Sequence, residues 1–467
     1  MGIAVSGWNL AKTVSKCGQL GVVSGTGIDS VLARRLQLGD LDGDLRRAID
    51  NFPWPGIASR VRDTYFVPGG KAPEAPFKLN PMKRMRLSRK SIELLLVANF
   101  VEVFLAKEDH DGVIGINYLE KIQRPTLPSL FGAMLAGVDY VLMGAGIPLA
   151  IPGILDGLAL GETVDLKLGA VSNPDRHKYA QRFDPTEYAE GEFPSLTRPK
   201  FLAIISSDTL AQTFIRRASG YTDGFVVEHH TAGGHNAPPR KDRSAPDRVN
   251  EYGPRDEANL EAIAKFGRPF WLAGGYASPE QLKWALEQGA TGVQLGSIFA
   301  TSNESGLLPH IRQDLIDRHL NQELVIRTDF RASPTGFPFK IAEMPQTMGQ
   351  PDVYEKRDRI CDMGYLREMY SIDEKRVGFR CASEPIDDFI KKGGTEERAS
   401  GRQCLCNGLM ATIGLGQVRD GVPEAPVVTA GDDFSFLEHV LTDGGRSYGA
   451  KDVLDYILSP VESAQPS

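Results

Sequence analysis

The sequence predicts an α/β protein built on a parallel sheet. Short apolar runs rich in β-branched and aromatic residues alternate with helical patterns over the first two thirds of the chain. Most of these runs are continuously apolar, which indicates strands covered on both faces, as in a barrel or a doubly wound sheet. We expect seven strands, at residues 21–24, 113–117, 140–143, 201–205, 224–228, 269–273 and 292–296.

A closed (β/α)8 barrel needs eight strands, so one strand is missing from this count. The shortfall falls at the amino end, where a helical pattern over residues 10–17 leads straight into the first run. We therefore expect either a truncated first strand, with Met1-Gly2 at its end, or a sequence that starts late in the barrel. If the chain folds as it stands, residues from the insertions must cover the neighbouring strand edge.

Two helices are signalled clearly. Ser278 is placed as an N-cap, with Pro279 at the first helical position, Gln281 in a capping box and Gly289 as the stop. Residues 92–106 are strongly apolar but shorter than the ~20 residues of a membrane-spanning helix, and they contain two glutamates. This second segment is interpreted as a buried helix of a soluble protein.

The remaining chain divides into insertions and an appendage. Residues 42–90 and 171–200 are rich in proline, glycine and charge, which indicates insertions between the alternating strands and helices. Residues 165–171 could form an extra strand. From residue 328 the sequence is polar and turn-rich, ending in a helical pattern at residues 450–458. We expect a barrel over residues 1–327 and a carboxyl-terminal appendage over residues 328–467.

The composition limits which binding partners and which cellular compartment we expect. The 467 residues have a net charge of −7, which gives no field to attract a nucleic acid. The five cysteines fit a reducing compartment, so we expect a cytoplasmic protein that binds neither nucleic acid nor membrane.

Glycines follow the last two predicted strands. Gly274 and Gly275 follow one, and Gly296 and Ser297 follow the other. Glycine lets backbone N–H groups approach an anion, and the loops after the last two strands of a barrel commonly bind phosphate. The alternative is that these glycines only end strands.

A histidine-rich loop follows the fifth predicted strand. His229 and His230 come directly after Glu228, and Gly233-Gly234 precede His235. Consecutive side chains at a strand end point to opposite sides, so Glu228, His229 and His230 are not expected to share a metal ion. His235 is the candidate acid or base, because an imidazole titrates near neutrality.

Two clusters, one of basic residues and one of cysteines, each have a structural explanation as well as a functional one. Arg240, Lys241 and Arg243 could attract an anionic substrate or a carrier phosphate, although a solvated loop fits them better. The other cluster lies in the appendage: Cys361, Cys381, Cys404 and Cys406. Their spacing matches no established zinc or iron–sulfur pattern, so buried thiols are preferred over a metal site, and no metal ligands are assigned.

The chain resembles the nitronate monooxygenase (2-nitropropane dioxygenase) family of FMN-dependent (β/α)8 TIM barrels, which also includes flavin enoyl reductases of fatty-acid and polyketide synthesis. The resembling stretches, in the family's order, are 17–27 (CGQLGVVSGTG), 115–117, 132–148 (GAMLAGVDYVLMGAGIP), 228–235 (EHHTAGGH), 273–275 and 292–300 (GVQLGSIFA). They cover residues 1–305, whereas residues 328–467 lie outside the pattern of simple members.

The resemblance implies roles for individual residues. The FMN phosphate would be bound by Gly274, Gly275, Gln294, Gly296 and Ser297; the flavin ring and ribityl chain would contact Ser24, Gly25 and Asn117, with Gly233 and Gly234 close over the ligand. His235 matches the family's active-site histidine.

Three functions follow from the resemblance. The first is oxidation of alkyl nitronates by O2 to a carbonyl compound and nitrite. The second is NAD(P)H-dependent reduction of an enoyl thioester on a carrier protein. The third is a non-catalytic flavin-binding scaffold. A homodimer is compatible with all three.

Overall fold

The computed structural model describes residues 2–169, 179–241, 250–373, 376–441 and 445–461. Its centre is a seven-stranded parallel sheet in the order β1-β2-β3-β6-β7-β8-β9. The strands are β1 (Gly21–Ser24), β2 (Ile114–Leu119), β3 (Tyr140–Gly144), β6 (Lys200–Ile205), β7 (Gly224–Glu228), β8 (Phe270–Ala273) and β9 (Gly292–Gln294). All seven predicted strands are confirmed.

The sheet curls so that its inner face encloses a small apolar core of its own. Leu142, Leu202, Val226 and Ala273 are buried there, and Trp271 packs against them from β8. Within the described residues β1 and β9 are the two edge strands and do not pair with each other. The α/β barrel class is confirmed, with the wall open between these two edges.

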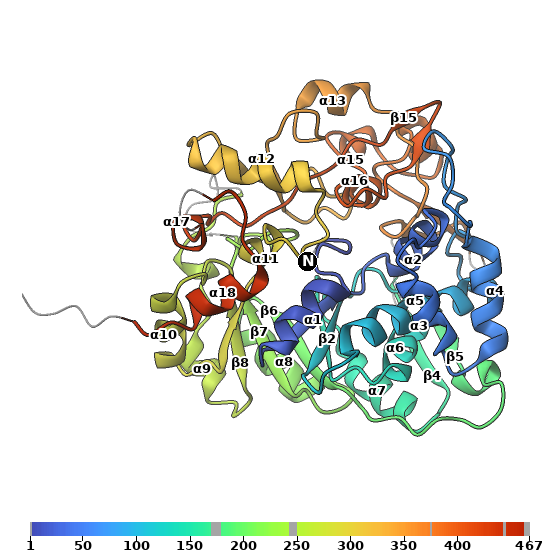
Figure 1. The fold of residues 1–467 in the computed structure, drawn as a ribbon, viewed down its shortest axis with the longest axis horizontal. Helices are drawn as coiled ribbons and strands as arrows, with labels where there is room; N and C mark the ends of the chain where they lie inside the picture. Colours follow the sequence, from blue (N-terminus) through green and yellow to red (C-terminus); the bar gives the residue numbers. More distant parts are fainter. Residues whose placement is uncertain (1, 170–178, 242–249, 374–375, 442–444, 462–467) are drawn as a thin grey trace, which may run out of the picture.

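Helices cover the outside of the sheet (Figure 1). They are α1 (Trp8–Lys16), α2 (Ile28–Gln37), α5 (Arg89–Lys107), α6 (Thr126–Leu135), α7 (Ile151–Ala159), α8 (Asp208–Arg217), α9 (Leu260–Ala264), α10 (Pro279–Glu287) and the short α11 (Ser297–Ala300). The predicted start of α10 is confirmed, because the Ser278 hydroxyl accepts a hydrogen bond from the Gln281 amide at 3.2 Å.

Helix α5 is the buried helix expected from its apolar sequence. Its two glutamates are buried but satisfied: Glu93 pairs with Arg60 at 2.8 Å, and Glu102 accepts from the Trp8 amide at 2.7 Å. Among the described residues no helix has the length and apolar character needed to cross a bilayer.

The two insertions add local structure outside the sheet. The first contributes α3 (Asp44–Asp50) and α4 (Pro55–Tyr65), both packed on α5. The extra strand is present as β4 (Val164–Leu168), which pairs antiparallel with β5 (Tyr179–Phe183). Residues 170 and 171 of that prediction lie outside the described residues, and the 3-10 turn η1 (Pro185–Tyr188) follows β5.

The carboxyl-terminal region consists of short elements and lies against the barrel (Figure 1). Helix α12 (Pro309–Leu320) precedes this region, and the short helix η2 (Pro254–Asp256) lies earlier, between β7 and α9. The elements of the region are β10 (Ile326–Asp329), β11 (Phe339–Ala342), α13 (Pro351–Lys356), β12 (Glu368–Ser371), β13 (Val377–Arg380), α14 (Ile386–Lys391), α15 (Glu396–Ala399), α16 (Leu405–Ala411), β14 (Val418–Arg419), β15 (Val422–Pro423), α17 (Leu437–Val440) and α18 (Ala450–Ile457). Helix α18, predicted from its pattern, packs on α1, α10 and α11. This region therefore covers the side of the barrel next to the open edges.

Candidate active site

Two neighbouring cavities lie in the barrel, one at the carboxyl ends of the sheet strands and one that also extends along the opening between β1 and β9. One, of about 460 Å³, is called the central cavity and contains the side chains of Asn117, Glu228 and His235 in its wall. The other, of about 520 Å³, is called the glycine cavity because Gly274, Gly275 and Gly296 line it. Six residues line both cavities: Gly2, Glu228, Gly233, Gly234, Gln294 and Thr429. The two cavities are therefore adjacent, and each is within the size range of small-molecule pockets.

The glycine cavity brings the predicted phosphate residues together. Gly274, Gly275, Gln294, Gly296 and Ser297 all line it. Gly274 and Gly275 have φ angles of 96° and 81°, a backbone region that favours glycine. A Cβ built on Gly296 would meet no atom within 4 Å, so this backbone faces open space. A Cβ on Gly274, by contrast, would lie 3.0 Å from Thr231 Oγ1, so this glycine packs against the histidine loop.

A segment of the carboxyl-terminal region completes this cavity. The Gly431 amide donates to the Ser297 hydroxyl at 2.8 Å, and the Gly234 amide donates to Thr429 Oγ1 at 2.9 Å. The Asp432 amide donates to the carbonyl of Thr231 at 3.1 Å. Residues 429–432 were not predicted from the sequence, because their one local signal is a glycine-containing turn.

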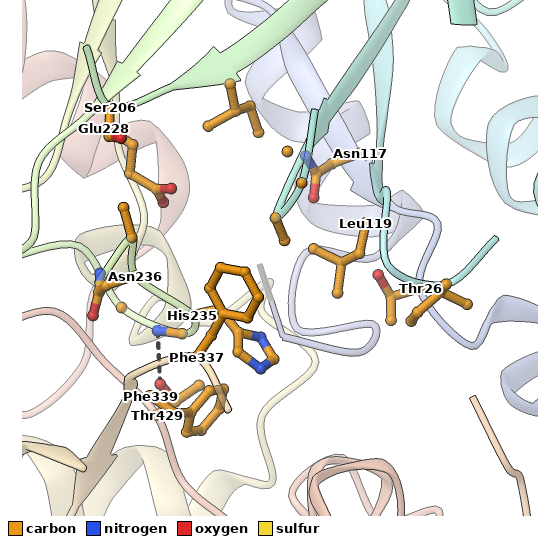
Figure 2. Close-up of a pocket in the computed structure, with 18 of the residues that line it drawn as sticks. Thr26, Asn117, Leu119, Ser206, Glu228, His235, Asn236, Phe337, Phe339 and Thr429 are labelled. Atoms are coloured by element: carbon orange, nitrogen blue, oxygen red, sulfur yellow. Dashed lines mark hydrogen bonds between the residues drawn. The ribbon is translucent and has the colours of Figure 1, made fainter. Parts of the chain in front are cut away.

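The central cavity is bounded by two groups of side chains (Figure 2). Thr26, Asn117 and Leu119 lie on one side, and Ser206, Glu228 and Asn236 on the other. Among the described residues the buried hydroxyl of Thr26 has no hydrogen-bond partner. A buried hydroxyl on a cavity wall without a partner is available to a ligand.

Two residues expected at the flavin, Ser24 and Gly25, line neither cavity. The Ser24 amide donates to the Ser6 carbonyl at 2.8 Å, and the Gly25 amide donates to the Asn117 carbonyl at 2.9 Å. A Cβ on Gly25 would lie 2.3 Å from the Tyr118 ring, so the glycine is required here by packing. The next residue, Thr26, reaches the cavity instead.

His235 lies in the wall of the central cavity. Its Nε2 is 2.7 Å from the Ser333 hydroxyl, and its ring packs edge-on against Phe339 with centroids 4.9 Å apart. Burial, together with the nearby Lys121, holds the pKa of His235 well below its usual value. The imidazole is therefore neutral at physiological pH and can donate one hydrogen bond.

A second set of titratable groups was not found from the sequence. The Lys121 ammonium lies over the Phe337 ring at 4.1 Å from its centroid, and it has no hydrogen-bond partner among the described residues. Burial lowers the pKa of Lys121 to about 7, although Glu120 and Glu228 act against this shift. Burial also raises the pKa of Glu228 to about 7, against the lowering effect of Lys121. Perturbed groups of this kind are typical of functional sites.

The other two histidines of the loop are engaged elsewhere. His229 contacts Thr231 Oγ1 at 2.7 Å and Glu257 at 2.9 Å through its two ring nitrogens. His230 stacks on Tyr252 with ring centroids 4.2 Å apart. His229, His230 and Glu257 have potential ligand atoms within 4.8 Å of one another, but both nitrogens of His229 are already used.

The basic residues after the histidine loop lie in different surroundings. Arg240 lines the central cavity and donates to the Ser206 carbonyl at 3.4 Å. The carbonyl of Lys241 accepts from Arg255 at 2.8 Å. Arg243 lies outside the described residues.

These features fit a flavin mononucleotide. The glycine cavity offers uncovered backbone for a phosphate, and the central cavity offers Thr26 and Asn117 to polar atoms of a ring. Because the two cavities share a wall that includes Gly233, Gly234 and Gln294, an elongated ligand that reached from one into the other would contact both sets of groups.

Comparison with known proteins gives only distant structural similarity. No family model and no curated protein matches the sequence. FabK from Thermotoga maritima aligns over 97% of this chain and 88% of its own, with 14% identity and a TM-score of 0.47. Nitroalkane oxidase from Streptomyces ansochromogenes aligns over 98% and 92%, with 12% identity and a TM-score of 0.44. The enoyl reductase domain of MlnA from Bacillus amyloliquefaciens aligns over 74% and 63%, with 11% identity and a TM-score of 0.38. Similarity at this level leaves cofactor and substrate to be argued from the site.

Proposed function

We propose that the chain is an FMN-dependent oxidoreductase. The observation that carries this proposal is that the glycine cavity and the cavity containing His235 share a wall, and that Gly274, Gly296 and His235 all follow the carboxyl ends of parallel strands. Catalytic and phosphate-binding residues of α/β barrels are found at this end.

The proposed phosphate ligands are backbone amides of Gly274, Gly275 and Gly296 and the hydroxyl of Ser297. The ring would lie along the central cavity against Asn117, with the Thr26 hydroxyl available to it. When bound, FMN supplies hydride and single-electron transfer, and the protein supplies orientation and exclusion of water.

The walls of the central cavity favour an acyl substrate. Aliphatic and aromatic side chains dominate its lining, including Leu119, Ile204, Phe337, Phe339 and Leu409. An apolar cavity binds a hydrocarbon chain through burial, at about 25 cal/mol per Å² of apolar surface. The resemblance alone ranked nitronate oxidation first, but we now propose reduction of an enoyl thioester, with NAD(P)H as reductant.

His235 would bind the thioester in this reaction. Because its imidazole is neutral, it can donate a hydrogen bond to the thioester carbonyl and orient it. The Ser333 hydroxyl, 2.7 Å from Nε2, holds the ring in place and leaves Nδ1 for the substrate. We propose the carrier-bound chain as the partner and the cytoplasm as the compartment.

Nitronate oxidation remains the second candidate because of Lys121. This ammonium is near enough to Glu228 and His235 to shift their pKa values, so its charge reaches the central cavity. A small nitronate anion would be attracted by it when Glu228 is protonated.

Anaerobic stopped-flow absorbance separates these functions. Rapid bleaching of the bound flavin by NADPH, followed by reoxidation on mixing with a trans-2-enoyl thioester, supports the reductase. Bleaching by propyl-2-nitronate but not by NADPH supports nitronate oxidation instead. A flavin that neither reagent bleaches would contradict both and leave the non-catalytic scaffold.

A further inference from the structure

The four cysteines of the carboxyl-terminal region gather around one small space. Cys361, Cys381, Cys404 and Cys406 all line a cavity of about 10 Å³, together with Arg367. We call this group the four-cysteine site. None of the four forms a disulfide.

Three elements bring these distant residues together. The β12–β13 hairpin returns the chain so that Cys381, directly after β13, lies near Cys361. Cys404 is the N-cap residue of α16, and Cys406 lies in its first turn. Tertiary structure therefore creates a convergence that the sequence spacing did not indicate.

Backbone amides lie near every sulfur. Those of Gly364 and Met363 lie near Cys361, and that of Ser383 lies near Cys381. The remaining pairs are Cys404 with the Asn407 amide and Cys406 with the Leu366 amide. N–H groups directed at sulfur stabilise a thiolate bound to metal and tune iron–sulfur clusters.

The surroundings contain positive charge that is not neutralised. Arg124 donates to the carbonyls of Lys83 and Gly364 at 2.8 and 2.9 Å, and Arg367 also donates to the Lys83 carbonyl, at 2.9 Å. Both guanidinium groups lie over the Phe379 ring. In the part of the chain that the structure describes, neither pairs with a carboxylate.

The nearby carboxylates are committed to other cations. Their pairs are Asp362 with Arg419, Glu424 with Arg357, and Glu384 with Lys392. Arg124 and Arg367 therefore have no carboxylate partner among the described residues. Four thiolates around a metal centre would supply the missing negative charge, since metal binding releases the thiol protons.

The sulfur spacing decides which metal centre fits. Four thiolates on one zinc ion, with Zn–S of ~2.3 Å, would place every sulfur pair at ~3.8 Å. Among the described residues no three of the four sulfurs lie within 4.8 Å of one another. The wider spacing suits a polynuclear centre, in which each sulfur binds a different corner or iron.

We propose that Cys361, Cys381, Cys404 and Cys406 are the ligands of an iron–sulfur cluster. Leu366, Leu405 and Cys406 line both the four-cysteine site and the central cavity. The cluster would therefore be separated from the proposed flavin site by a single layer of side chains. The proposal does not depend on the flavin, because the four cysteines and the two neighbouring arginines all belong to the four-cysteine site.

Metal and sulfide analysis of protein purified without oxygen tests this proposal. We expect iron and acid-labile sulfide in equal amounts, about four of each per chain for a cubane or two of each for the smaller cluster. Protein isolated without metal should take up the same amounts from ferrous iron and sulfide under anaerobic conditions. One zinc per chain without sulfide, or no iron uptake on reconstitution, would overturn the proposal.

Cysteine variants give the matched control. C404S/C406S should lose at least ten-fold in bound iron, whereas C17S should retain it, because Cys17 is exposed and far from the site in sequence. Equal iron in the two variants would contradict the assignment. If C404S/C406S does not fold, the iron and sulfide content of the wild-type protein still tests the proposal. Flavin is measured on the same samples, so failure of the proposed function and failure of the cluster are separate results.

Discussion

Replacement of Gly233 by alanine tests how the carboxyl-terminal region builds the proposed phosphate site. A Cβ at this position would lie 2.8 Å from the Ala430 carbonyl carbon and 2.9 Å from the Gly431 nitrogen. Ordinary contact begins near 3.4 Å, so the segment must move by about 0.6 Å. Such a movement would lengthen the 2.8 Å hydrogen bond from the Gly431 amide to Ser297 to about 3.4 Å, near the limit of a hydrogen bond.

The expected cost has two parts. Overpacking should lower the free energy of unfolding by about 1–3 kcal/mol. The lost positioning of Ser297 should weaken FMN binding by about 1–2 kcal/mol, which is roughly 5- to 30-fold in Kd. Urea unfolding measures the first quantity, and quenching of FMN fluorescence on titration with apoprotein measures the second.

The neighbouring Gly234 gives the control. It has a φ angle of 84°, but a Cβ there meets no atom within 4 Å, so G234A introduces backbone strain of about 1–2 kcal/mol without a clash. We expect G234A to lose stability and to keep its FMN affinity within about three-fold. Equal FMN affinity of folded G233A and wild type would refute this reasoning.

Three further predictions concern single side chains. H235N should retain bound flavin and lose about 10²-fold in turnover by steady-state assay, and an unchanged rate would remove the role of His235. For Lys121, the folded-state pKa of about 7 lies below the ordinary 10.5, so the unfolded chain binds more protons between these values and stability should rise with pH across that range. Urea unfolding of K121M at about pH 7.5 and pH 9.5 should lack this rise, and a slope equal to that of wild type would contradict the shift. Lys83 pairs with Asp29 at 2.5 Å, with side-chain exposures of 2% and 3%. K83M should therefore lose about 3–5 kcal/mol of stability, and K83M/D29N should recover part of it; no recovery would show that the loss is not due to an unpaired Asp29.

The strands were predictable because their signal is local. Each run, such as Gly224–Glu228, is continuously apolar and ends in polar or glycine-rich sequence, which reflects burial on both faces. The α10 start was predictable for the same reason, since Ser278 and Pro279 act on the backbone next to them. The loops after β8 and β9 could be placed once the strand order was known.

The rest of the site depends on contacts between distant residues. The segment around Gly431 reaches Ser297 across 134 positions, and no local pattern in that segment indicates it. In the sequence Lys121 resembles an ordinary loop lysine. Only the tertiary structure buries its ammonium near Glu228. The convergence of the cysteines likewise needs the β12–β13 hairpin.

The most direct test of the account is the identity of the cofactor released from purified protein. Heat denaturation followed by chromatography and mass spectrometry should yield FMN at about one equivalent per chain, or the apoprotein should bind FMN with quenching of its fluorescence. Protein that contains no flavin and does not quench FMN fluorescence on titration would contradict the proposal that the two adjacent cavities bind this cofactor.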